Sequence, residues 1–123
     1  MIVQVLRQIQ SVLNLSFWSD HYNSTAFESK ALVHNGAGIL KTAVIENTSN
    51  SAAFIQIFDA IAEPAQGTQP LSTLQLPANS MASIEFNRKL TTGIYVGLSS
   101  NQFTWEDAAV NGVFNIEFKS MRA

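Results

Sequence analysis

The chain has 123 residues, 46% of them hydrophobic and none of them cysteine, which fits one globular domain and excludes wholesale disorder, disulfides and thiolate chemistry. Its 7 Lys and Arg residues are scattered and nearly balance 9 Asp and Glu residues, which excludes the basic patch of a nucleic-acid-binding protein. Only 13% of the residues are charged, against about 25% in a typical soluble domain, and a surface rich in Ser, Thr, Asn and Gln suits a protein that packs against others.

The N-terminal segment, residues 1–18, carries an apolar stripe with the i, i+3, i+4, i+7 spacing of an amphipathic helix. As a candidate interface we take Ile2, Val5, Leu6, Ile9, Val12, Leu13, Phe17 and Trp18. Two interpretations stay open, namely a short helix packed on its own domain and an arm that docks on a neighbouring subunit. Because Val3 and Val5 also permit a strand, the pattern does not decide between helix and strand. Arg7 and three glutamines interrupt the apolar run, so we expect neither a secretory signal nor a membrane span.

Residues 17–37 lack periodicity and are punctuated by Ser, Asp, Asn and Gly. This pattern predicts a long loop with one short strand near Ala31–His34. Its aromatic residues are expected to cover one end of the core, with a binding surface as the alternative. His21 and His34 lie in or beside the loop without the spacing of a catalytic or metal site, so we predict two surface histidines.

From Gly38 onward the sequence predicts successive strands. Three are read from apolar, β-branched runs: Ile39–Glu46, Ala53–Asp59 and Leu71–Leu76. Three more alternate apolar and polar residues, over Ala82–Asn87, Ile94–Ser99 and Phe114–Lys119, which predicts one face on the core and one in solvent. The predicted fold is all-β, an antiparallel β-sandwich or jelly-roll-like barrel over residues 19–123, with residues 1–18 as an N-terminal arm or short helix.

Two connections are predicted to turn the chain. Asn87–Gly93 is expected to cross between sheets or to form a wide hairpin. Asn111-Gly112 is expected to form a tight turn before the last strand, because both residues tolerate positive φ. After residue 38, only Trp105–Val110 could form a helical turn.

No constellation of residues predicts catalysis, a cofactor or a metal site. The carboxylates are isolated except for Glu106-Asp107, which is expected in a solvated turn. Glu85 and Glu117 could face each other across strands, as a glycosidase pair would, but both fall on predicted outward faces. We therefore expect no enzyme. A small hydrolase would require a Ser and an Asp beside His21 in space.

The stretch from Asn47 to Ser100 runs from "FIQIFDA" through "PAQGTQP", "LQLP" and "IEF" to "LTTGIYVGLSS". It resembles a β-sandwich unit of small structural proteins of tailed bacteriophages, among them capsid decoration and cement proteins, and it covers a little under half of the chain. The resemblance implies a non-enzymatic virion protein without a cofactor, which buries surface against partners such as the major capsid protein. It also implies a homo-oligomer, with a trimer favoured, and no nucleic-acid or membrane partner.

A second function stays open, a carbohydrate- or receptor-binding sandwich module of a fibre or tail. The aromatic residues Trp18, Tyr22, Tyr95 and Trp105 could stack on sugar rings, with Asn and Gln side chains supplying hydrogen bonds.

Overall fold

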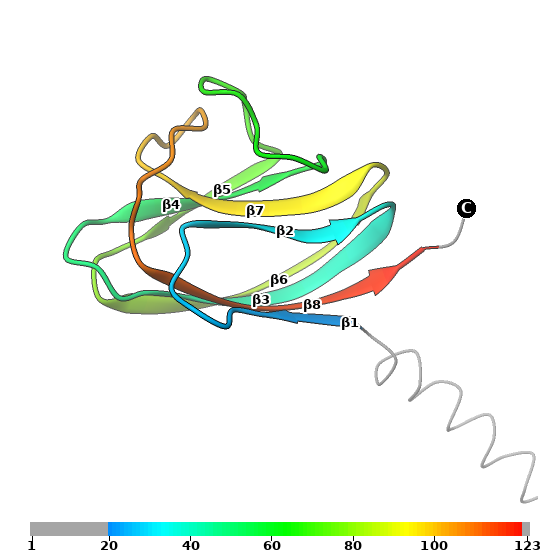
Figure 1. Cartoon of the computed structure of the whole chain (residues 1–123), viewed down its shortest axis with the longest axis horizontal. Helices are drawn as coiled ribbons and strands as arrows, with labels where there is room; N and C mark the ends of the chain where they lie inside the picture. The colour runs from blue at the N-terminus through cyan, green and yellow to red at the C-terminus, as the bar shows by residue number, and fades with distance from the viewer. Residues whose placement is uncertain (1–19, 122–123) are drawn as a thin grey trace, which may run out of the picture.

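The computed structural model describes residues 20–121, so the eight candidate interface residues, from Ile2 to Trp18, lie outside the described residues. The strands are β1 Asp20–Asn23, β2 Lys30–Asn35, β3 Gly38–Asn47, β4 Ala53–Phe58, β5 Ser72–Leu76, β6 Ser80–Leu90, β7 Gly93–Ser99 and β8 Gly112–Ser120. They form two four-stranded antiparallel sheets that face each other (Figure 1). The predicted all-β sandwich is therefore confirmed.

The strands pair in a nested order. One sheet, here sheet A, has the order β1-β8-β3-β6, and the other, sheet B, has the order β2-β7-β4-β5. Thus β1 pairs with β8, β2 with β7, β3 with β6 and β4 with β5, as in a long antiparallel ribbon wrapped around one core. This wrapping is the jelly roll, the eight-stranded form of the predicted sandwich. It leaves β1 and β6 as the edges of sheet A, and β2 and β5 as the edges of sheet B.

The core follows the alternation along β3 and β8. Ile45 of β3 and Phe114 of β8 lie opposite each other and are fully buried, while Glu46 and Asn115 point outward and are exposed. The predicted inward face of the last strand, Phe114–Phe118, is therefore confirmed. β6 alternates as predicted too, although its inward residues are only partly buried because β6 is an edge strand.

β7 departs from the prediction of one solvent-exposed face, because all of its residues are buried. Two loops, 59–71 and 100–111, supply covering residues for its outer face. Tyr95 forms a cluster with Phe58 of β4 and Trp105 of the second loop, and the rings of Phe58 and Trp105 meet edge to face at 5.6 Å. Alternation alone misses this cover because it comes from residues distant in sequence.

Two further predictions are corrected. The loop predicted over residues 17–37 contains a second strand, β1, in addition to the strand predicted near Ala31–His34. No helix forms over Trp105–Val110, where Asp107 instead makes an isolated bridge to Ser99.

The tight turn predicted at Asn111-Gly112 is wrong. Neither residue has a positive φ, and Gly112 begins β8. A Cβ on Gly112 would lie 2.7 Å from the Glu28 carbonyl oxygen, so the glycine serves a close backbone approach. The crossing predicted at Asn87–Gly93 is confirmed, although it is shorter than expected because β6 continues to Leu90.

Candidate functional site

The two histidines lie apart and in different surroundings. His21 is exposed on β1, with its Nε2 4.0 Å from Oε2 of Glu117. His34 of β2 is partly buried, not fully at the surface as predicted, and its ring centroid lies 5.0 Å from that of Phe118, with the two rings tilted by 35°. The contact that His21 makes is with a surface glutamate, which is not the arrangement of a serine hydrolase.

The glutamates that could have formed a glycosidase pair flank one strand. Thr42 of β3 is paired with Glu85 of β6 on one side and with Glu117 of β8 on the other. Glu117 lies 3.9 Å from Nζ of Lys41 on the same face, the solvated setting that the sequence predicts. Among residues 20–121, no three His, Asp or Glu side chains are arranged to hold a metal ion. The same part of the chain contains no helix long and apolar enough to cross a membrane.

Two of the four aromatic residues considered for sugar stacking belong to the core. Trp105 is 2% exposed and Tyr95 is 6% exposed, so neither offers a ring face to a ligand. The Tyr22 hydroxyl donates to the carboxylate of Glu28, which also accepts a hydrogen bond from the Ser24 hydroxyl. Burial, followed by this hydrogen bond to Glu28, raises the pKa of Tyr22. Trp18 lies outside the described residues.

A charged cluster ties the two loops over sheet B to β2. Nζ of Lys30 lies 2.8 Å from Oε1 of Glu63 in the first loop and 3.0 Å from Oδ2 of Asp107 in the second. The indole N–H of Trp105 donates to the other Glu63 oxygen at 3.3 Å. Hydrogen bonds to Glu63 and Asp107 raise the pKa of Lys30. Burial alone would raise the pKa of Asp107, but hydrogen bonds from the Ala109 amide and from Lys30 lower it. The cluster therefore links the 59–71 loop and the 100–111 loop through Lys30.

A set of hydrogen bonds to Asp59 holds the start of the 59–71 loop. The Asp59 carboxylate accepts hydrogen bonds from the backbone amides of Thr92 at 2.7 Å, Thr91 at 3.1 Å and Gly93 at 3.1 Å. It also accepts one from the Thr91 hydroxyl at 2.9 Å. Burial alone would raise the pKa of Asp59, but these hydrogen bonds lower it. Asp59 thereby joins the end of β4 to the turn between β6 and β7.

A buried glutamine fixes the tip of the second loop. The side-chain amide of Gln56 donates to the carbonyl oxygens of Asn101 at 2.7 Å, Thr104 at 3.2 Å and Gln102 at 3.3 Å. Phe103 lies between the residues so anchored and is 71% exposed. The loop therefore presents an aromatic side chain to solvent from an anchored backbone.

The three most exposed large apolar side chains of the described residues lie at one end of the sandwich, with Met81 on the outer face of sheet A and Phe103 on the loop that covers sheet B. In the described part of the chain, the three most exposed are Phe103, Met81 and Phe27. Phe27 follows the end of β1, Met81 pairs with Glu46 near the end of β3, and Phe103 follows the end of β7. We call these three residues the apolar pole. The start of β1 and the end of β8 lie together at the opposite end (Figure 1).

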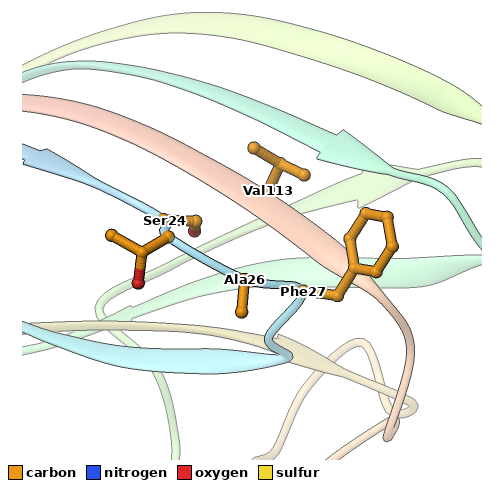
Figure 2. A pocket seen from close by; sticks show the side chains of 5 residues that line it. Ser24, Ala26, Phe27 and Val113 are labelled. Carbon is orange, nitrogen blue, oxygen red and sulfur yellow. The ribbon is translucent and has the colours of Figure 1, made fainter.

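A hollow adjoins this pole beside β8. It measures about 390 Å³ and is lined by Ser24, Thr25, Ala26, Phe27 and Val113. Figure 2 shows Phe27 and Val113 projecting from the neighbouring loop and strand. None of the five lining residues titrates near neutral pH, so the hollow offers apolar contact and no acid–base chemistry.

The outer face of sheet A carries several of the charged side chains in the described part of the chain. In the strand pairing across β8, β3 and β6, Ile39 lies between Lys119 and Lys89, and Thr42 lies between Glu117 and Glu85. The neutral polar surface expected from the composition is therefore not uniform.

Comparisons with known proteins assign no family. No protein-family model matches the sequence, and no curated protein matches it. Among solved structures, the chain is similar to the coat protein of Tobacco streak virus, with 14% identity, 85% of this chain and 88% of that chain covered, and a TM-score of 0.37.

Proposed function

We propose that the protein is a non-enzymatic structural component of a virion, and that its specific role is capsid decoration or cement. The observation that carries the proposal is the eight-stranded jelly roll with its nested pairing, an architecture that viral capsid and lectin domains share. Because a fold hosts many functions, the choice between these two depends on the surface. Burial of Tyr95 and Trp105 removes two of the four aromatic residues considered for sugar stacking and favours the capsid role.

The apolar pole supports contact with another protein. Isolated exposed apolar residues are ordinary, but Phe103 is held on an anchored loop and Phe27 borders an apolar hollow. Exposed apolar side chains on rigid supports bury well against a partner because little conformational entropy is lost on binding. The low charged fraction of 13% also reduces repulsion between closely packed copies.

In this proposal residues 1–18 are the arm and residues 19–123 the rigid body. The arm reaches a neighbouring subunit through its apolar stripe, and the major capsid protein of a bacteriophage is the favoured partner. A specific protein contact buries about 1,600 Å² in total. Repetition over a lattice multiplies a modest single-contact affinity, and a symmetric homo-oligomer protects sheet edges.

The test is co-sedimentation with capsids assembled without this protein. The full chain is expected to sediment with the capsids, and a variant lacking residues 2–16 is expected to remain in the supernatant. Two double variants are compared. Val5→Ser with Ile9→Ser changes the apolar stripe, and Gln4→Ser with Gln8→Ser changes residues beside the stripe. Only the double variant on the stripe should weaken binding. Failure of the full chain to bind would contradict the virion role, and undiminished binding by the shortened chain would contradict the arm.

A further inference from the structure

We propose that β6 is a contact between two copies of the chain. The two β6 strands pair antiparallel about a two-fold axis at Ser83 and join two A sheets into one continuous sheet. This inference goes beyond the virion role and does not depend on it, because it concerns the association of the purified protein with itself.

Incomplete burial at one edge of the sandwich is the first observation. Ala43 of β3 pairs with Ile116 of β8 on one side and with Ile84 of β6 on the other. Ala43 is 0% and Ile116 1% exposed, whereas Ile84 is only partly buried against the core. On sheet B, Leu74 of edge strand β5 is 44% exposed although its pairing partner Ile55 is in the core. Among residues 20–121, the apolar side chains that point inward are therefore less completely buried along the side where β5 and β6 end the two sheets.

An unprotected strand edge is the second observation. β6 has 11 residues and its outer side pairs with no other strand of the described fold, whereas the opposite edge strand β1 has 4 residues. Long exposed edges are normally blunted by charges, bulges or proline. β6 concentrates such devices after Phe86: Asn87 has a φ of 48°, the pairing with β3 shifts there, and Arg88 and Lys89 follow. Over Ser80–Phe86 the one charged side chain is Glu85.

β6 is complementary to a second copy of itself when the two-fold axis passes through Ser83. Because this axis is perpendicular to the sheet, the side chains that point inward in one copy lie beside those that point inward in the other. Ala82 therefore lies opposite Ile84 of the second copy, and Ser80 lies opposite its Phe86. Each pair combines a small and a large side chain, which fills space without overlap. On the outer face, Glu85 meets Met81 of the second copy. Placing the axis at Glu85 instead would oppose two carboxylates directly, which destabilises paired strands.

Light scattering of the full chain tests the contact. We expect a concentration-dependent mass that rises from one to two chains of 13.5 kDa. Ser83→Lys places two like charges face to face at the axis and should weaken dimerisation at least ten-fold. Asn115→Lys is the matched control, because Asn115 and Ser83 both pair with Val44, and Asn115 is exposed on a central strand. A mass that stays at one chain, or an oligomer that Ser83→Lys leaves intact, would overturn the proposal.

Cysteine cross-linking tests the register, and the chain has no cysteine of its own to interfere. At a two-fold axis the two residue-83 Cα atoms lie about 4.5–5.5 Å apart, within the range of a disulfide. Ser83→Cys should therefore give a covalent dimer on mild oxidation. Glu85→Cys should not cross-link with itself, because residue 85 faces residue 81 of the second copy. Equal cross-linking by both variants, or by neither, would contradict the register. Capsid binding plays no part in either readout, so the inference and the proposed function fail separately.

Discussion

Trp105 lies directly on the backbone of Gly97. A Cβ at residue 97 would be 2.4 Å from Cη2 and 2.5 Å from Cζ3 of the indole ring. Glycine in the middle of a strand normally weakens it, but here the missing side chain makes room for the ring that covers the outer face of β7. The two residues therefore form one packing unit between the sheet and its covering loop.

The variant Gly97→Ala is expected to lower the free energy of unfolding by about 1–3 kcal/mol, because the added methyl group overpacks a filled site. Urea unfolding followed by circular dichroism, which does not depend on Trp105 as a probe, measures the loss. Trp105→Leu, which removes the ring, is also destabilising, and the double variant should lose less than the sum of the two single variants. Simple additivity would show that the ring and the glycine do not interact.

The isosteric change Gln56→Glu should cost about 3 kcal/mol or more at neutral pH. A buried carboxylate would then face the carbonyl oxygens to which the Gln56 amide donates. The folded chain would hold this carboxyl group protonated, whereas the unfolded chain releases its proton above about pH 4.3. Stability relative to the wild type should therefore recover as the pH falls from 7 toward 5. Chemical denaturation at several pH values provides the measurement, and a constant difference would argue against burial of the group.

Removing the charge of Asp59 should destabilise the protein and reduce its sensitivity to acid. Because hydrogen bonds lower the pKa of Asp59 in the folded chain, its stabilisation is present above the ordinary aspartate pKa and is lost as the pH falls through the lowered value. Asp59→Asn is expected to cost about 1 kcal/mol at pH 7, as loss of a helix-capping carboxylate does. Thermal unfolding between pH 7 and 3 should give a flatter curve for this variant. Glu46→Gln, on an exposed position of β3, is the control for removal of a surface carboxylate.

Lys30→Gln should cost about 0.5–1 kcal/mol, because the Lys30 side chain is 36% exposed and solvent screens its ion pairs. The difference from the wild type should narrow in about 1 M salt, where the Debye length falls to about 3 Å, close to the 2.8 Å and 3.0 Å of the two ion pairs. The variant should also increase the hydrogen-exchange rate of the Trp105 backbone amide, which donates to the Thr68 carbonyl oxygen and joins the 59–71 and 100–111 loops. Unchanged exchange at this amide would mean that Lys30 does not couple the loops.

Period-two alternation correctly predicted the strands that have one face on the core and one face in solvent. Phe114–Phe118 and Ala82–Phe86 turn the expected side chains inward, because each strand has one neighbouring sheet to pack against. β1 escaped prediction because it has four residues, mostly exposed, and is held chiefly by pairing with β8, which lies about ninety residues further along the chain.

The surface was harder to predict than the strands. Tyr95 and Trp105 could have been binding residues by type, and only the folding of two distant loops over β7 makes them core residues. The roles of Gly97 and Gly112 likewise depend on what approaches them from elsewhere in the chain, which local turn preferences do not contain. The apolar stripe at residues 1–18 remains a prediction.

The position of β8 in sheet A affects when the sheet can form during synthesis of the protein. Sheet A has β8 between β1 and β3, so two of its three interfaces use the last of the eight strands to be synthesised. Until the ribosome has delivered that strand, β1 has no partner and β3 exposes one whole edge. The native sheet therefore cannot be completed during synthesis of the first seven strands, and its assembly waits on contacts of high sequence separation, which form slowly. Nascent chains of this protein should accordingly depend on chaperones at a late stage of translation.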